Sequence, residues 1–181
     1  MIKDLYNLIK FIKLQNNFRR VFFFENKFIE NHLEPYVRKN RNIKQTAIIS
    51  LYKIENKDLK KIKIFRVNSY FFLNIFFILL KIRYCYSSTP DLDNTAFKKS
   101  IFQKTKYIYI QHSPLGLNQI YTDNAFCNFD IVQVINIFQE NNLKEINKIK
   151  KKKIRLWRSK YLFFEINNKD KKFKIFKKNR I

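Results

Sequence analysis

Glycine is almost absent from this chain of 181 residues, which contains one glycine, three prolines and one tryptophan. Loops that cradle phosphate groups need several glycines, because backbone N–H groups must approach the ligand closely. The composition therefore excludes Walker loops and dinucleotide-binding fingerprints. It also excludes the nucleophile elbow of α/β-hydrolases, which needs two glycines around its serine.

Cysteine is also scarce, with Cys85 and Cys127 as the two thiols of the chain. Two cysteines so far apart provide neither a metal-binding spacing nor a disulfide framework. We interpret them as buried reduced thiols, which are typical of proteins in the cytoplasm. We expect no metal and no cofactor.

No apolar run is long enough to cross a membrane. The most apolar run, at residues 70–82, is interrupted by Asn74 and falls short of the roughly 20 residues that a spanning helix needs. We expect a buried helix there. The first seventeen residues contain Asp4 and no small-residue cleavage site, so they do not resemble a secretory signal.

Acidic residues are few, with 14 against 38 lysines and arginines, and the formal net charge is +24. Such a charge normally indicates a nucleic-acid or anionic membrane partner. Here lysine is enriched together with asparagine, isoleucine and phenylalanine, as expected from an AT-rich coding sequence, and it is spread along the chain. We interpret most of the charge as compositional bias, and predict that nucleic acid is not a partner.

Short apolar runs alternate with helical patterns, which predicts an α/β fold. We expect strands at residues 20–25, 46–51, 63–67, 83–87, 106–111 and 131–135, with a further candidate at 161–165. Helices are expected at residues 28–39, 70–82 and 139–150. Fully apolar strands suit a parallel sheet covered on both faces. The prediction is a single Rossmann-like, doubly wound and mostly parallel sheet over residues 19–166.

The two ends of the chain differ from this central domain. Residues 1–18 form an amphipathic helix in which lysines separate Leu5, Leu8, Ile9 and Ile12. This helix either packs on the domain or attaches to an anionic membrane surface. The basic segment 148–160 is either a solvated loop or an anion-facing patch. Residues 167–181 form a basic tail that we expect to be disordered.

Two polar loops follow predicted strands and are the candidate functional segments. The first, at residues 87–94, contains Ser88, Thr89 and Asp91 around Pro90. Hydroxyls and carboxylates around a proline either form turns and helix caps or bind a polyol or a phosphate.

The second loop begins with His112 and Ser113 and contains Gly116. A histidine at the carboxyl end of a strand lies where open α/β sheets bind ligands, and its near-neutral pKa suits it to remove a proton from a hydroxyl. Either Asp91, on the first loop, or Asp130 could orient the imidazole. The alternative is a histidine that ends a strand and bonds only to backbone groups. His32, between acidic neighbours, is interpreted as a surface residue.

Several segments in order resemble the CDP-glycerol glycerophosphotransferase family. They are Ser87–Leu92, Lys98–Ser100, Tyr107–Pro114, Ile120–Tyr121, Ala125–Phe126 and Phe129–Asp130. The resemblance covers roughly residues 20–165 and the amino-terminal half of the family. It departs from the family pattern at Ser113, which replaces a glycine, at the spacing to Pro114, which is one residue shorter, and at Gly116, where a lysine is expected.

The resemblance implies the amino-terminal domain of a GT-B-like transferase associated with the inner face of the cell membrane. It implies transfer of glycerol phosphate, or a similar polyol phosphate, from a CDP-activated donor to a hydroxyl of a cell-surface polymer such as teichoic acid. His112 would be the general base, and Ser88, Thr89, Ser113 and Gly116 would bind substrate. We expect the chain to lack the nucleotide-binding half and to need a separate carboxyl-terminal domain for catalysis. The alternative is a non-catalytic basic protein that binds a membrane surface or nucleic acid.

Overall fold

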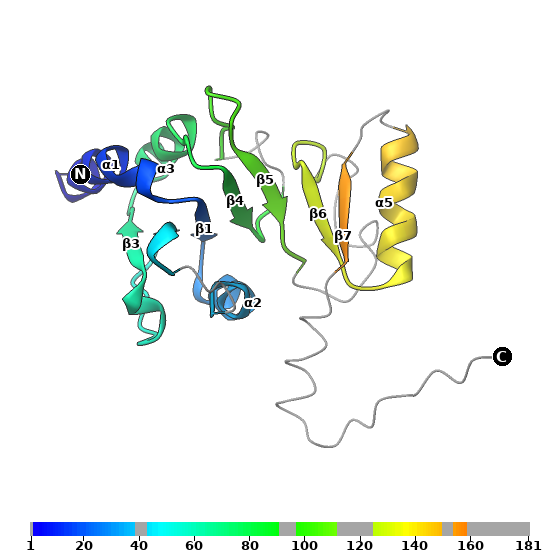
Figure 1. Cartoon of the computed structure of the whole chain (residues 1–181), viewed down its shortest axis with the longest axis horizontal. Helices are drawn as coiled ribbons and strands as arrows, with labels where there is room; N and C mark the ends of the chain where they lie inside the picture. Colours follow the sequence, from blue (N-terminus) through cyan, green and yellow to red (C-terminus); the bar gives the residue numbers. More distant parts are fainter. Residues whose placement is uncertain (1, 39–42, 91–96, 112–124, 150–153, 159–181) are drawn as a thin grey trace, which may run out of the picture.

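The fold is built on one parallel sheet (Figure 1). The computed structural model describes residues 2–38, 43–90, 97–111, 125–149 and 154–158. Seven strands lie in the order β3-β2-β1-β4-β5-β6-β7, and every neighbouring pair is parallel. The strands are β1 Arg20–Phe24, β2 Thr46–Ser50, β3 Lys63–Arg66, β4 Tyr84–Ser87, β5 Lys106–Tyr109, β6 Ile131–Val134 and β7 Arg155–Arg158.

The direction in which the chain adds strands reverses once, at the boundary between β1 and β4. Strands β2 and β3 extend the sheet on one side of β1, whereas β4 to β7 extend it on the other. This order is that of the doubly wound α/β folds, in which ligands bind at the carboxyl ends of the strands that flank the reversal. The predicted Rossmann-like α/β fold is therefore confirmed.

Helices lie on both faces of the sheet, because alternate side chains of each strand point to opposite faces. Val21 and Phe23 belong to the larger core, which also receives side chains from α1 (Ile2–Leu14), α3 (Tyr70–Ile78) and α5 (Ile137–Ile149). Phe22 and Phe24 belong to the smaller core, which is covered by α2 (Lys27–Arg38). Three short 3-10 turns complete the described elements, at Gln15–Asn17, Ile43–Gln45 and Leu59–Lys61.

Most predicted elements lie within two residues of the observed ones, and α3 is an exception. It ends at Ile78 rather than at residue 82. Ser69 caps its amino terminus by accepting a hydrogen bond from the Phe71 amide at 3.2 Å. Leu80 and Ile82 are nevertheless buried in the larger core. The apolar pattern therefore predicted burial correctly and overestimated the length of the helix.

The basic segment 148–160 contains a strand that the sequence did not indicate. We interpreted this segment as a solvated loop or an anion-facing patch, whereas residues 155–158 form β7 and pair with β6. The strand has the sequence Arg155-Leu156-Trp157-Arg158, with two adjacent apolar residues between charged ends, so it lacks the alternation that indicates a strand. An edge strand tolerates such charges because its outer side faces solvent. The candidate strand at 161–165 and the tail predicted to be disordered lie outside the described residues.

The amino-terminal helix is part of the domain. Leu8 and Phe11 of α1 are buried in the larger core, and the Phe11 ring lies 5.1 Å from that of Phe65. The carboxylate of Asp4 accepts hydrogen bonds from the backbone and side-chain nitrogens of Asn68, at 3.1 and 2.8 Å. Among the helices that the structure describes, none is long and apolar enough to span a membrane.

The two thiols provide a test of this core. Cys85, on β4, is buried, and burial raises the pKa of its thiol well above that of a free cysteine, whereas Cys127 is partly exposed. Because the thiolate is the reactive form, iodoacetamide at pH 8 should label one thiol in the native protein and two after unfolding. Mass spectrometry of wild type and Cys127→Ser measures this difference. Rapid labelling of native Cys127→Ser would contradict the buried position of β4.

Candidate functional site

The candidate site lies at the carboxyl edge of the sheet, where β1 and β4 end side by side. The two strands pair in register from Arg20 with Tyr84 to Phe22 with Tyr86. Glu25 follows β1, and Ser88 and Thr89 follow β4. In doubly wound sheets this is the crevice in which ligands bind. The hydroxyl-rich loop predicted from the sequence is therefore at the reversal point of the topology.

Ser87 uses its hydroxyl to build the turn after β4. Its Oγ accepts a hydrogen bond from the Thr89 amide at 3.0 Å and donates to the Thr89 carbonyl at 3.4 Å. Ser50 at the end of β2 makes the same pair of contacts with Tyr52. Such side-chain turns let the chain leave a buried strand without leaving polar backbone groups unsatisfied. The turn-forming interpretation of the loop is thus correct for Ser87.

Thr89 and Glu25 join the two strand ends. The Thr89 hydroxyl donates a hydrogen bond of 2.7 Å to the Glu25 carboxylate, and both side chains are partly buried. A hydrogen bond to a carboxylate is stronger than one between neutral groups. Sequence reasoning missed Glu25 because it treated this residue as the last of the strand. An acidic residue directly after Val-Phe-Phe-Phe was the signal that could have identified it.

Ser88 differs from its two neighbours. It is 1 % exposed, and its Oγ has no hydrogen-bond partner among the described residues. A buried hydroxyl without a partner costs about 1–3 kcal/mol relative to one that is hydrogen-bonded. Ser88 directly follows β4, so this hydroxyl belongs to the loop at the carboxyl edge of the sheet.

A second set of polar contacts, a series of hydrogen bonds, holds the end of β5. The Gln111 amide donates to Oε1 of Gln133 at 3.1 Å, and Nε2 of Gln133 donates to the hydroxyl of Tyr36 on α2. Both glutamines are fully buried. Two strands and a helix are therefore tied together at the residue that precedes His112.

Four of the predicted site residues lie outside the described residues. They are Asp91, His112, Ser113 and Gly116. The structure thus brings together Glu25, Ser88 and Thr89, and fixes the strand end before His112. Whether Asp91 lies beside His112 stays a prediction.

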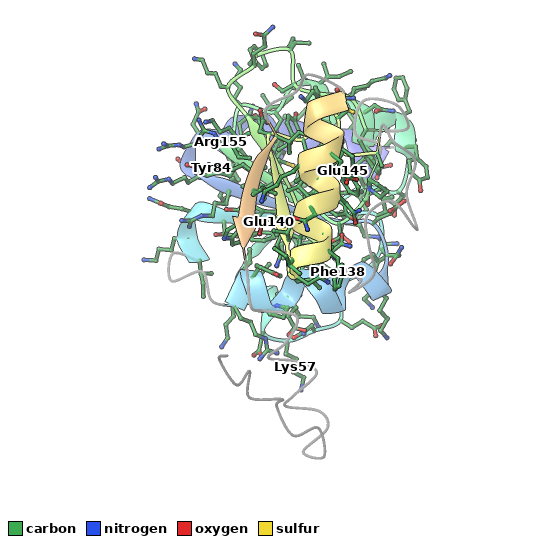
Figure 2. All side chains as sticks on the ribbon, turned by 90° about the vertical axis from the view of Figure 1, so that its right-hand side faces the viewer. Lys57, Tyr84, Phe138, Glu140, Glu145 and Arg155 are labelled. Carbon is green, nitrogen blue, oxygen red and sulfur yellow. The ribbon has the colours of Figure 1, made fainter. Side chains whose placement is uncertain are left out.

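Two cavities lie away from this edge. One, of about 360 Å³, is an apolar groove on the smaller-core face, lined by side chains of β4 to β7 that include Tyr84, Tyr86 and Arg155; Figure 2 shows Tyr84 and Arg155 on the side of β7 away from α5. Burial raises the pKa of Tyr86, and the nearby charge of Arg20 partly offsets this increase.

The second cavity, of about 300 Å³, contains Lys99, Lys106 and Asp130, and Asp130 accepts a hydrogen bond from the Tyr107 amide at 2.8 Å. Neither cavity includes a described residue of the candidate site.

The chain matches no protein-family model, no curated protein and no solved structure. The resemblance to glycerophosphotransferases therefore rests on the motifs alone. Among the described residues, no group of three or more histidine, cysteine, aspartate or glutamate side chains could hold a metal ion.

Substitution of the two adjacent serines separates their roles. Ser87→Ala removes the hydrogen bonds of the turn and should destabilise the protein by about 1 kcal/mol. Ser88→Ala removes a buried hydroxyl that has no partner among the described residues, and should leave the free energy of unfolding unchanged or raise it by up to about 1 kcal/mol. Urea unfolding measures both. A loss of stability in Ser88→Ala equal to that in Ser87→Ala would show that the Ser88 hydroxyl is already satisfied.

Proposed function

We propose that this chain is the acceptor-side domain of a glycerophosphotransferase-like enzyme, and that it binds a hydroxyl-rich acceptor at the ends of β1 and β4. The observation that carries the proposal is the group of polar side chains at this reversal point. Glu25 and Thr89 are joined there by a 2.7 Å hydrogen bond. Ser88, which precedes Thr89 in the sequence, has a buried hydroxyl with no partner among the described residues.

The charge of this group favours a neutral hydroxyl over a phosphate. A carboxylate only accepts hydrogen bonds, so Glu25 attracts hydroxyl donors and repels phosphate oxygens. Ser88 adds a group that both donates and accepts. A polyol offers donors and acceptors together, as the acceptor end of a glycerol-phosphate polymer does. The described part of the site therefore suits the acceptor better than the nucleotide donor.

In the proposed reaction, His112 removes the proton from an acceptor hydroxyl. The resulting oxygen attacks the phosphorus that carries glycerol in CDP-glycerol, a new phosphoester bond forms, and the phosphoanhydride bond breaks. CMP leaves with the bonding electron pair. Gln133 would act as a positioning residue, because it holds the backbone of Gln111 next to His112 in the sequence.

The donor needs cationic groups, and Lys27, the cation two residues after Glu25, pairs with Glu55 at 4.0 Å. A transferring phosphoryl group develops negative charge, which enzymes stabilise with arginine, lysine or metal ions. The proposal therefore includes a separate nucleotide-binding domain as a partner for CDP-glycerol. Acceptor binding by this chain does not depend on that partner.

The two histidines of the chain provide a matched test. CMP release from CDP-glycerol is measured with a glycerol-phosphate primer, in the presence of the nucleotide-binding partner domain, for wild type, His112→Ala and His32→Ala. We expect His112→Ala to reduce the rate about 10²–10⁴-fold, as for loss of a general base, and His32→Ala to retain it. Equal rates in wild type and His112→Ala would contradict the assignment of the base.

Equilibrium binding of the primer tests the acceptor site separately. Ser88→Ala should weaken primer binding about tenfold, since a hydrogen bond is worth about 1 kcal/mol or more, without a loss of stability. Ser100→Ala is the control, because its hydroxyl lies on the opposite edge and donates to the Leu80 carbonyl at 2.5 Å. Primer binding unchanged by Ser88→Ala would exclude this site.

A further inference from the structure

Helix α1 has two apolar faces, and only one of them is covered within the described structure. The inner face carries Leu8 and Phe11 into the larger core. The outer face consists of Ile2, Leu5, Tyr6, Ile9 and Ile12, and all five side chains are exposed. Ile2, Leu5, Ile9 and Ile12 recur at the spacing that aligns residues on one side of a helix. Exposed apolar stripes of this kind mark interaction surfaces.

The inner face fixes the direction of the outer face. Asp4 is held by Asn68, and the side chain of Asn7 donates to the Arg66 carbonyl at 2.8 Å. Together with the buried Leu8 and Phe11 these contacts leave the helix one orientation on the sheet. The outer face of α1 is therefore held away from the core.

Helix α3, which contacts α1, has exposed aromatic side chains at its start. It lies beside α1 at one end of the molecule (Figure 1). Tyr70 and Phe71 begin the helix just after Asn68, the residue that binds Asp4, and Phe71 is 67 % exposed. Aromatic side chains are favoured at the boundary between a bilayer and water.

The exposed charges on α1 are all positive. Lys3, Lys10 and Lys13 lie along or beside the outer face, and the one acidic residue of the helix, Asp4, is buried on the inner face. Lys10 also lies over the Tyr6 ring, with its ammonium 5.4 Å from the ring centre. An apolar stripe bordered by lysines is the pattern of a helix that lies in the surface of an anionic bilayer.

We propose that the outer face of α1, with Phe71, binds the surface of an anionic lipid bilayer. The apolar side chains enter the boundary of the acyl chains, and the three lysines contact the headgroups. The charge favours lipid over a second copy of this chain, because two such faces would bring six lysines together. This inference is independent of the proposed transfer reaction, and either can fail without the other.

Two sets of variants test the surface in the full-length chain. The first replaces the apolar stripe, with Ile2→Gln, Leu5→Gln and Ile9→Gln together, because glutamine preserves helix propensity. Its control is Ile137→Gln with Phe138→Gln on α5, where Phe138 is 72 % exposed and lies at the far end of the molecule from α1 (Figures 1 and 2). The second set reverses charge at Lys3, Lys10 and Lys13 to glutamate. Its control makes the same change at the exposed Lys57, Lys60 and Lys61.

Binding is measured by co-sedimentation with vesicles of equimolar phosphatidylcholine and phosphatidylglycerol, and with vesicles of phosphatidylcholine alone. We expect wild type to bind the anionic vesicles at least tenfold more tightly, since each lysine near such a surface contributes about fivefold. The stripe variant should bind the anionic vesicles roughly 100-fold more weakly than wild type. The variant with reversed charges on α1 should lose at least as much affinity. Both controls should stay within a few-fold of wild type.

Three results would overturn the proposal. One is no binding of wild type to anionic vesicles. Another is equal weakening by the two charge-reversal sets, which would show attraction by net charge alone. The third is a dimer in light scattering that the stripe variant dissociates, which would show that a second copy covers the surface. Circular dichroism and thermal unfolding of each variant keep these results separate from loss of folding, because the replaced side chains are exposed or, for Lys10, partly exposed.

Discussion

The parallel arrangement of β1 between β2 and β4 is the constraint on which the rest of the structure depends. Parallel pairing places the carboxyl ends of all strands on one edge, and the order of the strands reverses at β1. Strand β1 can occupy this position because Val21, Phe22, Phe23 and Phe24 are all buried, on alternating faces. The residues directly after β1 and β4 are then brought together, although 64 residues separate Glu25 from Thr89.

Most polar side chains described at this edge of the sheet form hydrogen bonds that fix the backbone. Ser50 and Ser87 close turns with their hydroxyls, and Gln133 holds the backbone of Gln111. These contacts satisfy buried polar groups, as folded proteins generally require. Within the part of the loop that the structure describes, Ser88 is the hydroxyl without a hydrogen-bond partner among the described residues. A buried group that costs stability is expected where ligand binding can compensate for it.

The sequence predicted the fold better than the site, for physical reasons. A buried parallel strand is a short apolar run, and β1, β2 and β5 are such runs. Strand β7 was missed because an edge strand buries little, so its apolar signal is weak beside Arg155 and Arg158. Glu25 was missed because its role comes from β4, which pairs with β1 only in the folded chain. Ser88 and Thr89 were identified because hydroxyls beside a proline stand out in a chain poor in both glycine and proline.

In a chain dominated by lysine, the few acidic residues are more informative about individual surfaces than the net charge is. With 14 acids against 38 basic residues, net charge says little about any one surface, whereas several acids have a defined partner. Asp4 binds Asn68, Glu34 binds Arg38, and Asp130 binds the Tyr107 amide, so each of them supports a helix or a strand. Glu25 differs in that its partner is a hydroxyl at the carboxyl edge of the sheet. A carboxylate placed there, in a chain otherwise rich in cations, is the strongest local argument for a hydroxyl-bearing ligand.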